Sequence, residues 1–93
     1  MTKVKPLLGR TGKPVANQYI IIEDEIRTYF QSYDSIISCV DFSYTPIKVE
    51  LDAKFWNYSV TTSTYRNKFL GESTKETQAK INSGEYKLVD LNN

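Results

Sequence analysis

The sequence contains no histidine, a single cysteine and no long apolar run. Without an imidazole base, its serine and threonine hydroxyls lack the usual partner for nucleophilic catalysis, and the commonest acid-base residue at neutral pH is missing. Cys39 cannot form an internal disulfide, and we expect it to fill space between apolar neighbours. Glycine motifs for phosphates or dinucleotides are also absent. These absences favour binding over catalysis, and we predict a protein that is not an enzyme, with no cofactor and no metal site.

The apolar run at residues 19–22 is far shorter than the roughly 20 residues that a membrane-spanning helix needs. We therefore expect a soluble, intracellular protein without a membrane partner. With 93 residues, of which 40% are hydrophobic, the chain fits one small domain. Its aromatic residues, 13% of the total, help such a domain to bury apolar area.

Charge is distributed unevenly, although the formal net charge is only +1. The first 18 residues carry four basic side chains and no acidic one. Glycine and proline interrupt this segment, so we expect residues 1–17 to be a flexible basic arm and residues 18–93 to be a single α+β domain. A basic arm can bind phosphates or simply solubilise the chain. The candidate nucleic-acid-binding residues are Lys3, Lys5, Arg10 and Lys13.

Alternating apolar and polar residues predict strands in the first half of the domain. The third of these strands has an alternative, a short helical start capped by Asp34 or Ser35. Acidic residues 23–25 suit a turn between the first two strands. A further strand-like run closes the chain. The predicted strands cover residues 18–23, 26–31, 35–42, 47–52 and 85–91.

Capping signals predict two consecutive helices between about residues 61 and 83. Thr61 is the expected N-cap of the first helix, with Val60 and Tyr65 spaced as a hydrophobic staple. Ser73 and Glu76 have the spacing of a capping box. Glycines at positions 71 and 84 are expected to end the two helices. The predicted fold is α+β: a small antiparallel sheet of four to five strands with both helices packed on one face.

Arg66 borders the apolar face of the first predicted helix. One interpretation is structural: its stem packs and its head pairs with a carboxylate of Asp34, Asp41 or Asp52. The other is that an exposed Arg66 joins nearby aromatic residues in a contact surface, since arginine and aromatic residues dominate interface energetics. The predicted partner-binding residues are Trp56, Tyr58, Thr64, Arg66, Asn67 and Lys68.

Residues 29–37, 56–73 and 81–92 resemble a group of short bacteriophage and prophage proteins of undefined function. The resemblance covers about two-thirds of the chain and leaves the basic arm outside it. Its most distinctive element is the pattern Y-S-x-T-T-x-x-Y-R-x-x-F-L, which is matched here by Tyr58, Ser59, Thr61, Thr62, Tyr65, Arg66, Phe69 and Leu70.

The resemblance implies a phage-encoded accessory protein in the cytoplasm of a bacterial host. We predict a non-enzymatic binding protein that inhibits or modulates a host or antiphage-defence protein, for example a CRISPR effector. The alternative is a small nucleic-acid-binding protein that uses the basic arm and an aromatic sheet face. A structural or assembly role is a weaker third hypothesis. Homo-oligomerisation and the identity of the target are left open.

Overall fold

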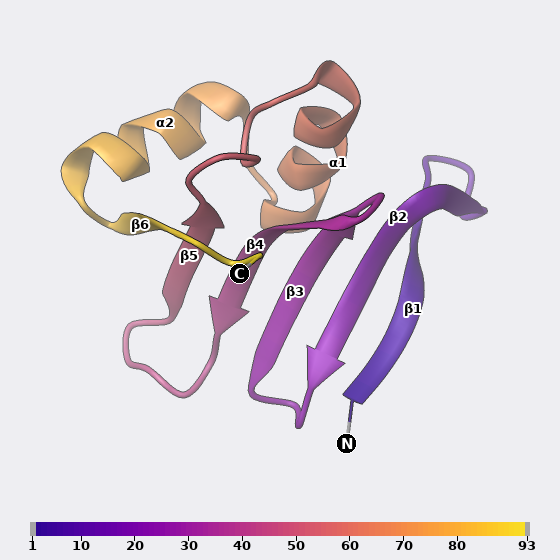
Figure 1. Cartoon of the computed structure of the whole chain (residues 1–93), viewed down its shortest axis with the longest axis horizontal. Coiled ribbons are helices and arrows are strands. Elements are labelled where there is room, and N and C mark those ends of the chain that lie inside the picture. The colour runs from indigo at the N-terminus through magenta and orange to yellow at the C-terminus, as the bar shows by residue number, and fades with distance from the viewer. Residues whose placement is uncertain (1, 93) are drawn as a thin grey trace.

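A computed structural model describes residues 2–92 and shows one six-stranded sheet with two helices inserted before its last strand (Figure 1). The strands lie in sequence order, and each neighbouring pair is antiparallel except the last, which is parallel. The α+β class is therefore confirmed, with six strands in place of the expected four to five. The elements are β1 (Thr2–Leu8), β2 (Pro14–Glu23), β3 (Arg27–Ser32), β4 (Ser35–Asp41), β5 (Lys48–Asp52), α1 (Val60–Leu70), α2 (Thr74–Ser83) and β6 (Tyr86–Val89).

The expected N-terminal arm is the main correction. Residues 2–8 form β1, which pairs with β2 from Thr2↔Glu23 to Leu8↔Pro14, so the arm belongs to the sheet. The sequence of β1 does not show the apolar alternation of a strand. Lys3 and Lys5 stand on the same side of the strand as buried Leu7, and Pro6 interrupts the segment. An edge strand tolerates both features, since one side of its backbone has no partner strand.

Tight turns connect the antiparallel strands. Asp24 and Glu25 both adopt positive φ angles of 50° and 61° between β2 and β3, which agrees with the turn expected there. Tyr33 has a φ of 54° in the short turn before β4. Strand β4 begins directly at Ser35, so the alternative of a helical start there is wrong.

Both helices end as predicted, but the first begins earlier. Gly71 and Gly84 adopt left-handed C-cap conformations, and Ser73 forms the predicted capping box with Glu76. The N-cap of α1 is Ser59, whose hydroxyl accepts from the Thr62 amide at 3.1 Å. Thr61 is therefore not the cap, and Val60, which is 85% exposed, forms no staple.

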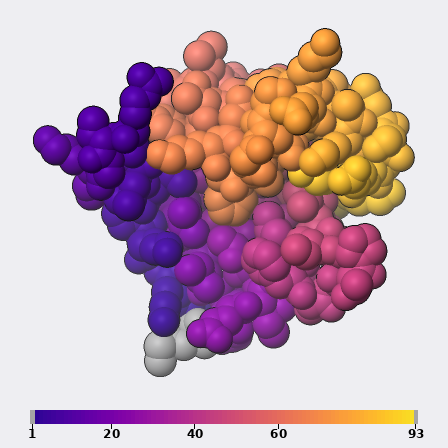
Figure 2. All heavy atoms as spheres, turned by 180° about the vertical axis from the view of Figure 1, so that it is seen from behind, coloured from indigo at the N-terminus to yellow at the C-terminus, as the bar shows by residue number. Residues whose placement is uncertain are grey.

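The core lies between α1 and the middle of the sheet. Leu7, Phe30 and Ile37 form its buried apolar cluster. Phe69 of α1 stacks on Phe30 with ring centroids 5.7 Å apart, and Tyr65 also packs against this cluster. Figure 2 shows the helix-bearing face: the helices, in salmon and orange, cross its upper part, and strand residues in purple lie uncovered below them.

Candidate functional site

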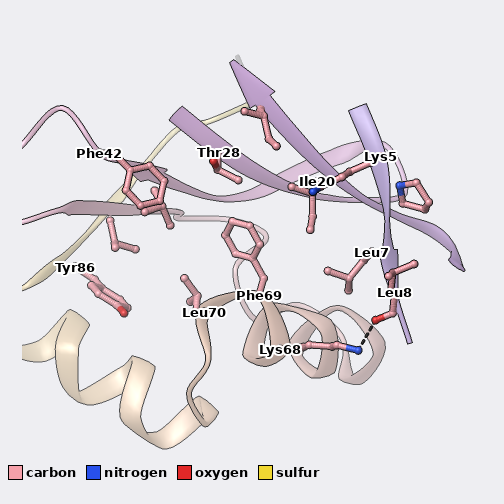
Figure 3. A pocket seen from close by; sticks show the side chains of 14 residues that line it. Lys5, Leu7, Leu8, Ile20, Thr28, Phe42, Lys68, Phe69, Leu70 and Tyr86 are labelled. Carbon is pink, nitrogen blue, oxygen red and sulfur yellow. Dashed lines mark hydrogen bonds between the residues drawn. The ribbon is translucent and has the colours of Figure 1, made fainter. Parts of the chain in front are cut away.

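An apolar groove of about 790 Å³ lies on the helix-bearing face, between the sheet and the C-terminal end of α1 (Figure 3). Strand pairing explains its floor. One row of paired residues crosses β2 to β6 on this face, and every member of the row lines the groove. The row consists of Ile22, Thr28, Val40, Val49 and Tyr86.

The adjacent row, two residues along each strand, is covered at its centre. Its central members Phe30, Ser38 and Leu51 are fully buried, and Phe69 of α1 stacks on Phe30, whereas Ile20 at one end of this row is half-buried and also lines the groove. In the first, uncovered row Ile22, Thr28, Val40 and Val49 are only half-buried, and Tyr86 at its end is buried. Part of the apolar face of the sheet therefore stays open beside α1.

Half-exposed apolar side chains lie at the two ends of the groove. Leu8 is 49% exposed at the β1 end, and Phe42 is 53% exposed just after β4 (Figure 3). Large apolar side chains are usually buried, so an apolar groove that continues into exposed apolar ends is typical of a contact surface.

The charged side chains that line the groove are cationic. Lys5 from β1 and Lys68 from α1 line it, and its described lining residues include no carboxylate. The Lys68 ammonium donates a hydrogen bond to the Leu8 carbonyl oxygen, a neutral acceptor (Figure 3). Lys3 pairs with Ile22 and so belongs to the same face of the sheet. The groove therefore combines an apolar floor with a positive rim.

A cluster of hydrogen-bonded polar side chains lies at the β6 end of the groove, beside Tyr86. Tyr86 donates to the Glu72 carboxylate at 2.6 Å, Lys80 donates to it at 2.9 Å and Thr77 at 2.6 Å. Burial alone would raise the pKa of Glu72, but these hydrogen bonds hold it below its ordinary value. Burial and the bond to Glu72 raise the pKa of Tyr86 to about 12. This cluster ties α2 to β6 and is internally paired.

Arg66 is fully buried, not exposed as the contact-surface interpretation requires. Its guanidinium lies over the Trp56 ring, 5.0 Å from the ring centroid. Burial lowers the pKa of Arg66. Its hydrogen-bond acceptors among the described residues are all neutral: the Trp56 carbonyl oxygen and the side-chain oxygens of Asn57, Ser63, Asn67 and Thr74.

None of the three carboxylates proposed as partners of Arg66 is among its acceptors, and Asp34 is exposed in the turn between β3 and β4. Asp41 pairs with Arg27 at 3.1 Å on the opposite face of the sheet. Asp52 accepts from the backbone amides of Lys54, Phe55 and Leu91. Arg66 instead connects the loop after β5 to both helices, which is a structural role.

The predicted partner-binding residues divide into three groups. Arg66 and Trp56 hold the loop, as described above. Tyr58, Thr64 and Asn67 line a polar depression of about 520 Å³ beside the start of α1. Lys68 faces the apolar groove instead. Sequence reasoning missed the groove floor, because the alternation in β2 to β5 marks an apolar face without showing how much of it the helices cover.

The predicted nucleic-acid-binding residues also fall in different places. Lys3 and Lys5 lie on β1, and residues 10 and 13 lie in or beside the turn that leads to β2. On the face away from the helices, Tyr19 and Tyr29 are half-buried among charges of both signs, including the Lys48–Glu50 pair at 3.7 Å. That face is not uniformly basic.

The remaining groups that could carry chemistry are the cysteine and the acidic side chains. Cys39 is 3% exposed, and burial raises its pKa to about 11, so its thiol is protonated at neutral pH. Across residues 2–92, no cluster of three or more His, Cys, Asp or Glu side chains is placed to hold a metal ion. Neither of the two helices is of a length and composition that would span a membrane.

Comparison with known proteins gives one match. The sequence profile of DUF8033, a family of unknown function, matches residues 2–85. The chain belongs to this family. No curated protein and no solved structure matches it. The DUF8033 match begins within β1 and ends just before β6, so it includes both sides of the groove, with Lys5 on one and Lys68 on the other.

Proposed function

We propose that this DUF8033 chain is a non-enzymatic binding protein that docks a partner protein in its apolar groove. The observation that supports the proposal is the uncovered row of the sheet, which leaves an apolar floor open beside α1. Covering this floor and its exposed ends removes apolar surface from water, and each square ångström contributes roughly 25 cal/mol. A protein partner provides that cover.

The shape of the groove favours a protein over a small molecule. A small ligand binds tightly when a pocket encloses most of its surface. Here one wall is helix, the floor is sheet, and Leu8 and Phe42 at the two ends remain half exposed (Figure 3). A protein surface covers both the floor and these ends, as interface cores do.

The resemblance to phage proteins supports the choice of target. We infer that the partner is a host or antiphage-defence protein, such as a CRISPR effector, and that binding inhibits or modulates it in the bacterial cytoplasm. This part of the proposal rests on the sequence resemblance. The groove supplies the physical means, and no catalytic step is required of the chain.

A paired-variant pull-down tests the proposal. Leu8→Ser together with Phe42→Ser removes the exposed apolar ends of the groove, and Tyr33→Ser removes an aromatic side chain that is 51% exposed outside it. From a bacterial lysate, the wild type and Tyr33→Ser should retain the same partner, and the double variant should lose it. Equal retention by all three would contradict the proposal.

Nuclease treatment of the same lysate distinguishes a protein partner from the alternative, a nucleic-acid partner. If the chain binds nucleic acid through its basic N-terminal residues, the recovered material should disappear after nuclease treatment and at raised salt concentration. A protein partner docked in an apolar groove should survive both. Loss on nuclease treatment would favour the alternative and direct mutagenesis to residues 3, 5, 10 and 13.

A further inference from the structure

The floor of the groove offers side chains and no free backbone groups. Its central strands, β2 to β5, are paired on both sides, so their amides and carbonyls are already used. An extended peptide laid on this floor would bring its own backbone groups against apolar side chains without partners, which is costly. An α-helix satisfies its backbone internally and presents only side chains. The floor therefore suits a helix.

The sheet edges give an extended peptide little alternative. Strand β1 carries Lys3, Lys5 and Pro6, which are features of edges that resist pairing with another strand. The opposite edge, β6, is only four residues long. Addition of a partner strand, the other common mode of peptide recognition by a sheet, is disfavoured at both edges.

The rim determines the polar chemistry of the occupant. Lys5 and Lys68 line the groove without a carboxylate among its described lining residues, and the acceptor that Lys68 contacts, the Leu8 carbonyl oxygen, is neutral. A carboxylate beside the apolar surface of the occupant would find two cations there, whereas a lysine would meet like charge. Charge complementarity therefore points to an acidic residue next to the apolar stripe.

On these grounds, and resting on the proposed function, we propose that the groove binds an amphipathic α-helix of the partner with an acidic side chain beside its apolar stripe. The stripe consists of residues spaced i, i+3 or i+4, and i+7, which lie on one helical face. These residues cover the uncovered row of the sheet. The acidic residue lies at the β1 side, against Lys5 and Lys68.

Selection from a library of displayed 16-residue peptides against the full chain tests this inference without knowledge of the partner. We expect enriched peptides to show helical apolar spacing with Glu or Asp at its border, and to gain helical circular dichroism on binding. In the double variant Lys5→Glu with Lys68→Glu, their affinity should fall about tenfold or more, and peptides with Lys in place of the acid should bind better. Lys75→Glu, outside the groove, is the matched control.

Three results would overturn the inference: no enrichment, enriched peptides with alternating apolar residues, or affinity unchanged by the charge-reversed variant at an unchanged melting temperature. The groove variant Leu8→Ser with Phe42→Ser distinguishes failure of the helical occupant from failure of the proposed docking groove. Alternating peptides that lose binding to it would leave the proposed docking groove standing and remove only the helix. Peptides that bind it as well as the wild type would count against the groove itself.

Discussion

Two neighbouring rows of the same sheet face have different surroundings. Phe30, Ser38 and Leu51 in the centre of the covered row are fully buried, whereas Thr28 and Val40 in the centre of the uncovered row are only half-buried in the groove. Both rows are built from strand-forming residues two positions apart. The position of α1 contributes to their difference, because Phe69 stacks on Phe30 of the covered row and Arg66 holds α1 in place. The covered row stabilises the fold, and the uncovered row leaves apolar surface open on the same face.

Loss of the Arg66 anchor should have the largest effect on this arrangement. Arg66→Met keeps an apolar stem but leaves the Trp56 carbonyl without its buried donor and removes one of the two donors to the Thr74 hydroxyl oxygen. We expect a loss of about 3 kcal/mol in the free energy of unfolding, measured by urea denaturation. Arg66→Lys, which keeps the charge but loses the fork of donors, should be intermediate. A Met variant as stable as the wild type would contradict the anchoring role.

The polar cluster at Glu72 should give a smaller, pH-dependent effect. Glu72→Gln removes the charge that Lys80 and Tyr86 contact, and should cost about 2 kcal/mol at pH 7. Because the folded-state pKa of Glu72 lies below its ordinary value of 4.5, its contribution is present above pH 4.5 and is lost as pH falls through the folded-state pKa.

The measurement is the unfolding free energy of wild type and Glu72→Gln from pH 7 downward. The difference between them should shrink as the wild-type carboxylate becomes protonated. Glu85→Gln is a suitable comparison, since that side chain is exposed just before β6, whereas the Glu76 carboxylate accepts from the Ser73 amide and also has a lowered pKa. A difference for Glu72→Gln that stays constant with pH would show that charge is not the cause.

Local signals in the sequence predicted the elements better than their arrangement. Gly71, Ser73 and Gly84 marked helix boundaries, because caps depend on residues a few positions apart. The groove could not be predicted in this way. It depends on register across five strands and on where α1 lies, neither of which is a short-range property.

Arg66 and β1 were misjudged for a related reason. The sequence pattern of α1 does not distinguish a buried arginine from an exposed one, because two of the acceptors that Arg66 contacts lie in the loop after β5 and in α2. The lysines of β1 resemble a flexible basic arm, although β2 pairs with them. In both cases contacts with a neighbouring element of the fold overrode a pattern within one segment.

The start of α1 allows a test with a matched pair of variants. Ser59→Ala removes the hydroxyl that accepts from the Thr62 amide, and should cost about 1 kcal/mol. Thr61→Ala, at an exposed position in the first turn, should change stability by less than about 0.5 kcal/mol. Equal losses in thermal or urea denaturation would return the cap to Thr61 and shift the start of α1.

A substitution in the uncovered row should have the smallest effect on stability and a visible one on binding. Thr28→Val exchanges a hydroxyl for a methyl group of similar size in the centre of the groove floor. Both residues favour strands, so the free energy of unfolding should change by less than about 0.5 kcal/mol. If the row contacts apolar side chains of a partner, the more apolar floor should tighten binding a few-fold, measured by titration with a selected peptide. The matched control is Thr64→Val, an exposed threonine outside the groove, which should leave affinity unchanged. Weaker binding by Thr28→Val at unchanged stability would mean that the occupant places a polar group on this row, and the division between a covered apolar row and an apolar docking row would fail.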